Sequence, residues 1–145
     1  MQKGQISTET LALIGVILLL MIPFILYAIG KSNTAKEDFA VQKAEFAAQR
    51  LARLADSIGY LGGSSAIVEQ IDVPPYVKSV RIGGGGHDII FEMDTSSGKK
   101  QIVRTTPFNI TADGFDKIKK EGTYYIQIRA LSNFSGGAQI KMSVQ

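Results

Sequence analysis

The chain of 145 residues contains no cysteine, no tryptophan and a single histidine, His87. Without thiols the chain can form neither a disulfide nor a thiolate metal site, so its hydrophobic core or its partners must hold it folded. One histidine cannot build a usual zinc site alone, and the aspartates lack the D-x-D-x-D-G spacing of a calcium-binding loop. We therefore expect no metal and no cofactor.

A cluster of charges of one sign is also missing. The net charge is +3, but basic and acidic residues interleave over residues 36–56 (KEDFAVQKAEFAAQRLARLAD). A nucleic-acid groove requires a cluster of basic residues, so we expect no nucleic-acid partner. No serine lies in a nucleophile elbow, and RIGGGGHD lacks the Lys-Ser/Thr of a phosphate loop, so a hairpin loop is the better interpretation. We expect no enzymatic activity.

Charge is absent altogether between Thr10 and Gly30. These 21 residues would form a helix of roughly 31 Å, which matches the ~30 Å hydrocarbon core of a bilayer. The run LALIGVILLLMIPFILYAI has no polar face, so it predicts a helix inserted in a membrane or buried within something large. Pro23 should kink or loosen that helix. A secretory signal would carry a cleavage site after the apolar run, and none is evident.

Before the apolar run stands KGQISTE, in which Glu9 lies at the membrane edge, where an acid costs little. This stretch resembles the processing site of archaeal type IV pilin-like proteins with a class III (Q-x-S-x-E) signal peptide. The resemblance implies that a prepilin peptidase cuts between Gly4 and Gln5, with Lys3 as the basic leader residue. Ser7 and Glu9 then fill the third and fifth positions of the mature chain.

The resemblance covers about the first 30 residues and implies a function. The chain is expected to be a structural subunit, a pilin, of an adhesive cell-surface filament. It would be membrane-bound as a precursor and extracellular when mature, with assembly ATPase and platform proteins as further partners. In that family the acid at the position of Glu9 is thought to meet a neighbouring subunit's new amino terminus. Cyclisation of Gln5 would remove that positive charge.

Three alternatives stay open. A monomeric, membrane-anchored extracellular binding module would use the same helix purely as an anchor. A minor pilin could prime or tip the filament. An archaellin, the subunit of a swimming filament, ranks lower because its usual processing site lacks the Q-x-S-x-E pattern.

Residues 31–59 predict an amphipathic helix. Thr34 and Glu37 have the spacing of a capping box, and Gly59 is a candidate C-terminal stop. Apolar residues at helical spacing predict one buried face, and they include Phe39, Ala40, Ala44, Phe46, Ala47, Leu51, Leu54 and Ile58. The face should pack on the domain that follows, or the alanine-rich flank (Val41, Ala48, Ala52) should associate with another copy.

From residue 60 the pattern changes to alternation with period two, as in HDIIFEMD, TYYIQIRAL and AQIKMSV. Weaker strands are expected at AIVEQIDV, YVKSVRI and KQIVRTT, with a short helical turn in ADGFDKIKKEG. The predicted class is α+β: a long hydrophobic helix, continuing into an amphipathic helix, packed with an antiparallel head of about six strands. The predicted organisation is a leader (1–4), a core helix (5–30), an amphipathic helix (31–59) and a β head (60–145).

Two N-glycosylation sequons occur in the predicted head, at Asn109-Ile110-Thr111 and Asn133-Phe134-Ser135. Both lie in or beside turn regions, where an extracellular domain would expose them. Two matches in a chain of this length also arise by chance.

Overall fold

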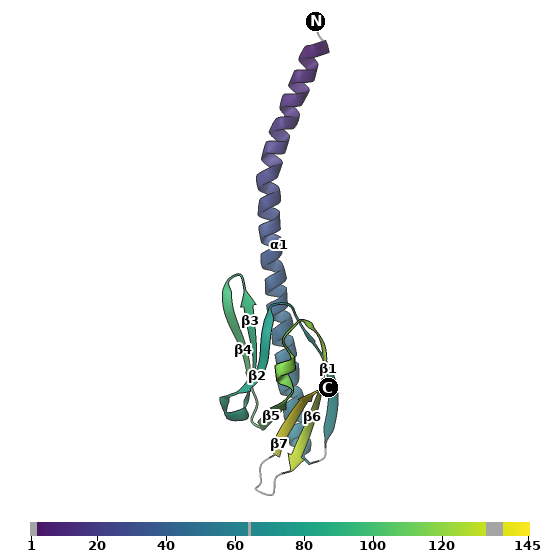
Figure 1. The fold of residues 1–145 in the computed structure, drawn as a ribbon, viewed down its shortest axis with the longest axis vertical. Coiled ribbons are helices and arrows are strands. Elements are labelled where there is room, and N and C mark those ends of the chain that lie inside the picture. The colour runs from purple at the N-terminus through teal and green to yellow at the C-terminus, as the bar shows by residue number, and fades with distance from the viewer. Residues whose placement is uncertain (1–2, 64, 133–137) are drawn as a thin grey trace. The chain divides into compact units, whose positions relative to one another are not determined.

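The computed structural model describes residues 3–63, 65–132 and 138–145, and the side chains of residues 8–63, 65–131 and 139–145. It confirms the α+β class: one long helix, α1 (Lys3–Leu61), precedes seven strands in the described residues (Figure 1). The chain divides into two compact units, Met1–Lys36 and Glu37–Gln145. Each unit is considered by itself, and the second is called the head below.

The head contains two sheets. The first has the strand order β1-β6-β7-β5 and the second has the order β2-β3-β4. The strands are β1 (Ala66–Val73), β2 (Val77–Gly83), β3 (Asp88–Thr95), β4 (Gly98–Thr105), β5 (Asn109–Asp113), β6 (Gly122–Ser132) and β7 (Ala138–Val144), with 3₁₀ turns η1 (Gly84–Gly86) and η2 (Phe115–Lys117). The short turn η2 falls within the segment predicted to hold one.

The head departs from the prediction in two details. The described residues contain seven strands, where about six were predicted; β5 was not predicted, because only Ile110 of its five residues is buried and the strand shows no alternation. The head is also not wholly antiparallel, since β5 pairs parallel to β7 (Ile110 opposite Ile140). The order and direction of strands depend on contacts that a local pattern does not record.

The helix is continuous, as predicted, but the predicted capping box at Thr34 and Glu37 does not form. Thr34 does not begin a helix: its hydroxyl donates to the Gly30 carbonyl 3.2 Å away, one turn back. Its supposed partner Glu37 instead accepts hydrogen bonds from the backbone N–H and the hydroxyl of Ser96, in the β3–β4 turn. The helix continues past Gly59 and ends before Gly62, whose positive φ of 76° is the left-handed conformation typical of a helix stop.

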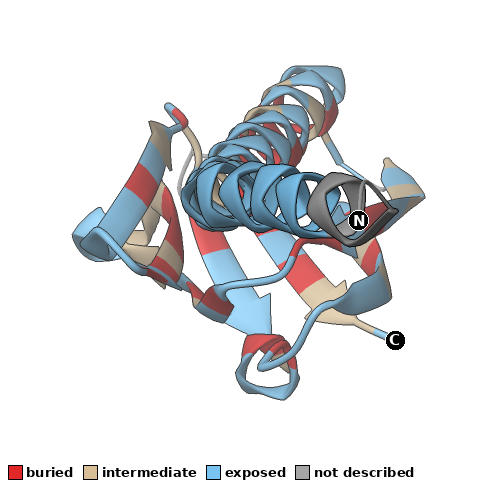
Figure 2. Ribbon diagram, turned by 90° about the horizontal axis from the view of Figure 1, so that it is seen from above, coloured by how far each residue is buried: buried red, intermediate tan, exposed pale blue. Residues whose placement is uncertain are grey.

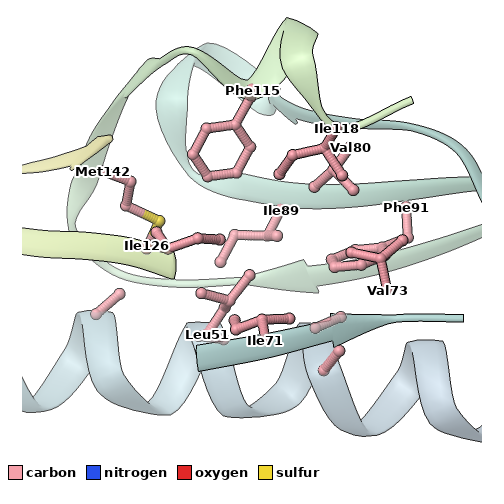
Figure 3. Close-up of a cluster of buried hydrophobic side chains, with 14 of the residues drawn as sticks. Leu51, Ile71, Val73, Val80, Ile89, Phe91, Phe115, Ile118, Ile126 and Met142 are labelled. Carbon is pink, nitrogen blue, oxygen red and sulfur yellow. The ribbon is translucent and has the colours of Figure 1, made fainter. Parts of the chain in front are cut away.

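Residues 37–61 of α1 belong to the head and bury an alanine-rich face in its core. Leu51 is fully buried, and the other buried members of this face are Ala40, Ala44, Ala47, Ala48, Ala52, Ala55 and Ile58. Leu51 and Ile71 lie on the helix side of the core, while Phe115 closes its opposite side (Figure 3). The prediction that the helix packs on the head is therefore confirmed. Phe39 and Phe46 were wrongly placed on the buried face, since they are 59% and 71% exposed.

The β4–β5 connection is fastened to the last turns of the same helix. The hydroxyl of the buried Thr106 donates to Asp56 Oδ1 at 2.5 Å and accepts from the Phe108 backbone N–H at 3.3 Å. The rings of Tyr60 and Phe108 meet edge to face, with centroids 5.0 Å apart. Gly59 is required here, because a Cβ at this position would lie only 2.5 Å from the Phe108 ring.

The glycine-rich loop and the Ser-Ser-Gly turn form the predicted hairpins. Residues 84–87 join β2 to β3, with all three η1 glycines at positive φ, and residues 96–97 join β3 to β4. The alternation in the strands is also confirmed, since Ile89, Phe91 and Met93 are buried. Ile90 breaks the alternation and is buried too, because its side chain lies under Gly83.

Candidate functional site

The apolar stretch of α1 is helical and entirely exposed. Every residue from Thr8 to Lys36 is exposed (Figure 2), and the most apolar 18-residue window of the helix has a mean hydropathy of 2.8 with none of it buried. By length and composition this helix could cross a membrane. Fifteen large apolar side chains between Leu11 and Ile29 are exposed, which leaves the stretch without an apolar partner in its own unit.

The C-terminal end of this stretch carries an interfacial signature. The Lys31 ammonium lies over the Tyr27 ring, 5.7 Å from its centroid, which is cation–π geometry. Tyrosine and lysine are residue types that anchor a helix end at a membrane–water boundary. The helix remains continuous through Pro23. A side chain added at Gly15 or Gly30 would meet nothing within 4 Å, so neither glycine is required by packing in its own unit.

The predicted processing motif lies at the start of α1. The helix begins at Lys3, so the backbone on both sides of the Gly4–Gln5 bond is helical. The side chains of Lys3, Gln5 and Ser7 lie outside those the structure describes. Glu9 is described and exposed, and it is the only acidic residue in the first 36. The structure thus places the motif on the helix that also carries the apolar stretch.

The two sequons lie in different situations. Asn109 is the first residue of β5, and its side chain is exposed; its amide donates to the Gly85 carbonyl at 3.2 Å. That hydrogen bond uses one of the two amide hydrogens, so the other stays available for linkage to a sugar. Asn133 lies outside the described residues.

Among the described residues, no group of three His, Cys, Asp or Glu side chains is placed to hold a metal ion. His87 Nδ1 lies 3.3 Å from the Thr106 carbonyl, so this ring nitrogen donates to the backbone at that contact. The histidine therefore serves the contact between the β2–β3 loop and the β4–β5 connection.

The head contains a groove that no local sequence pattern indicated. The groove has a volume of about 710 Å³ and is lined by residues 78–82 of β2, residues 109–112 of β5 and the η2 segment. The groove lies between β2 and β5, which are edge strands of different sheets, so it follows from the sheet topology and not from a local pattern. The missed strand β5 forms one wall, and so the groove could not be found from periodicity.

Comparisons of the chain with protein-family models, with curated proteins and with solved structures find no match.

Proposed function

We propose that this chain is a pilin-like structural subunit of an archaeal cell-surface filament, matured by cleavage between Gly4 and Gln5. The observation that carries the proposal is a fully exposed apolar helix directly after KGQISTE, followed by a β-sheet head. The proposed order of events is anchoring of the precursor in the bilayer, cleavage, and packing of the same helix against other copies.

The energetic argument concerns the fifteen exposed apolar side chains between Leu11 and Ile29. Fully burying one such side chain stabilises by about 1.5–3 kcal/mol; because these side chains are 48–73% exposed, shielding all fifteen contributes on the order of 10–30 kcal/mol. A typical domain is stable by only about 5–15 kcal/mol. The helix therefore needs lipid or other helices around it. Transfer from lipid to a helix bundle is nearly neutral in apolar burial, so assembly at the membrane avoids exposure to water.

Glu9 supplies a polar contact that the apolar side chains cannot make. It is exposed and stands one residue before the uncharged run. In a filament core its carboxylate would require a partner, such as the amino terminus of the next mature subunit, which would set the axial register. We expect Glu9→Ala to leave processing intact and to reduce filament yield. A wild-type yield would contradict the register role.

The test of processing is the mass of the mature protein, measured intact, with Gly4→Val against Gly15→Val. Gly4 precedes the proposed cut, whereas a Cβ at Gly15 meets nothing within 4 Å. We expect the wild type and Gly15→Val to lose four residues and Gly4→Val to stay full length. A shortened Gly4→Val chain would refute the processing site. The same spectra show whether Gln5 has cyclised, by loss of one ammonia.

The head groove favours one other candidate, a monomeric membrane-anchored binding module, because a binding module requires a recognition surface. Negative-stain images of sheared cell-surface material distinguish the two functions. Filaments that contain this chain support the pilin, and an intact membrane-bound monomer supports the module. Abundance in such filaments separates a major pilin from a minor or priming one.

A further inference from the structure

We propose that the groove between β2 and β5 binds an extended peptide segment of a partner protein, which pairs through its backbone with the edge of β5. The inference concerns the head alone and holds whether or not the chain assembles into filaments.

The position of the groove follows from which residues line it. Consecutive residues contribute from both strands, 78–82 from β2 and 109–112 from β5. Because successive side chains of a strand point to opposite faces, a cavity that meets every residue in turn lies beside the strand's edge. Each strand has one sheet neighbour, β3 for β2 and β7 for β5. The groove therefore lies beside the edges of β2 and β5.

The groove is closed at one end and has an apolar floor. The Asn109 amide bonds to the Gly85 carbonyl and joins β5 to the β2–β3 loop at that end. Val80, Ile110 and Ile118 are lining residues that are also buried in the core. The edge of β5 spans five residues, so the complementary segment is about five residues long, or roughly 17 Å of extended chain.

The edge of β5 also lacks the residues that usually protect an edge strand. Lysines, arginines and prolines on an edge discourage pairing with another chain. The two edge strands of the other sheet carry such residues, Lys78 and Arg81 on β2 and Lys99, Lys100 and Arg104 on β4, whereas β5 (NITAD) has none of these types. An unprotected edge beside a groove suits added-strand recognition, in which the backbone supplies affinity and side-chain pockets supply specificity.

The charge of the lining indicates the chemistry of the occupant. Three basic residues and one acid line the groove: Lys78, Arg81, Lys119 and Asp116. Arg81 bonds to Glu92 at 2.9 Å, and Lys78 lies 3.8 Å from Asp94, so both are partly neutralised. Lys119 forms no ion pair with the described part of the chain. The best-suited segment therefore alternates apolar side chains, which meet the floor, with acidic side chains, which meet the basic rim.

The test measures binding of a fluorescein-labelled peptide, Thr-Val-Glu-Val-Glu-Thr, to the full chain in dodecylmaltoside micelles by fluorescence anisotropy. Two control peptides are matched to it. In one, lysine replaces each glutamate; in the other, alternate backbone nitrogens are methylated. We expect saturable binding of the first peptide and at least about tenfold weaker binding of the other two. Absence of saturable binding, or equal binding of the methylated peptide, would overturn the proposal.

Two protein variants locate the site. Ala112→Trp fills the groove from an exposed position on β5, and Ala66→Trp places the same side chain at an exposed position on β1, at the opposite edge of that sheet. We expect about tenfold weaker binding for the first and no change for the second. Hydrogen exchange of the wild type should show new protection in β5. Protection confined to β1 or β4, or equal binding by the two variants, would refute the site.

Discussion

The two stretches of α1 differ in how they use apolar residues. Residues 8–36 carry large aliphatic side chains on all sides, and every one is exposed. Residues 37–61 carry alanines on one face and charges on the other, and the alanine face is buried in the head. A helix can thus be rich in apolar residues because it buries one face in its own domain, or because it is suited to lipid or other helices on all sides. The distribution of apolar side chains around the helix axis distinguishes the two cases.

The size of the side chains separates the two stretches further. Alanine on the buried face lets the strands approach the helix backbone closely, so the head needs only Leu51 and Ile58 as large buried residues from this helix. In residues 8–36 the large side chains have no such partner in their own unit. The first stretch is therefore suited to surroundings that other molecules provide, either lipid or other helices.

The largest expected effect compares the same substitution in both stretches. Leu51→Ala removes a fully buried side chain and should lower the free energy of unfolding of the head by about 2–5 kcal/mol. Leu19→Ala removes a side chain that is 70% exposed and should change it by less than about 0.5 kcal/mol. Urea denaturation of the full chain in micelles, followed by tyrosine near-UV circular dichroism, measures both. Equal effects would contradict the division of the helix.

The second prediction introduces a charge into each stretch. Leu18→Arg places a cation within the uncharged run, where a central arginine costs about 2.5–3.5 kcal/mol in a membrane. Phe46→Arg makes the same change at a side chain that is 71% exposed on the head. We expect about a hundredfold drop in membrane partitioning for Leu18→Arg and none for Phe46→Arg, measured by flotation with liposomes. Comparable losses would show that the head also inserts.

The third prediction tests the polar fastening of the second stretch. Thr106→Val leaves Asp56 and the Phe108 N–H without this hydroxyl, which should cost about 1–3 kcal/mol. Thr123→Val removes a hydroxyl that donates to Asp72 on the exposed surface, and it should cost less than about 1 kcal/mol. A double-mutant cycle with Asp56→Ala isolates the helix contact. Additive single effects would mean that the two side chains are not coupled.

The sequence predicted the fold class and most elements because those depend on local periodicity. The strands at AIVEQIDV and AQIKMSV agree with β1 and β7 residue for residue, and η2 lies where a turn was expected. Phe39 and Phe46 were assigned to the wrong face, because their helical spacing was taken to mark the buried side. The alanines assigned to that face, Ala40, Ala44 and Ala47, are buried as predicted, but how closely the strands approach them is set by the tertiary fold.

The functional features likewise divide into those that a local sequence pattern indicates and those that depend on the tertiary fold. The apolar run and its processing motif are contiguous in sequence, so the sequence alone suggested them. The groove is formed by β2 and β5, which are separated in the chain and belong to different sheets. The partners of Glu37 and Asp56 are likewise distant in sequence, at Ser96 and Thr106. Such contacts follow from the tertiary fold and could not be read from local patterns.

The smallest expected effect is on the pH dependence of the head's stability. Acid can protonate carboxylates of the head, whereas residues 10–30 contain no carboxylate. The Ser79 hydroxyl, and then the Arg81 guanidinium, lower the pKa of Glu92. The unfolded chain therefore binds the Glu92 proton at a higher pH than the folded head does. The resulting stability is complete above the ordinary glutamate pKa, about 4.3, and is lost as the pH falls through the lowered value. Glu92→Gln should flatten the pH dependence of urea denaturation in that acidic window and leave the helix content of residues 10–30 unchanged. An unchanged slope would show that the bonds to Ser79 and Arg81 persist in the unfolded chain or do not favour the charged form.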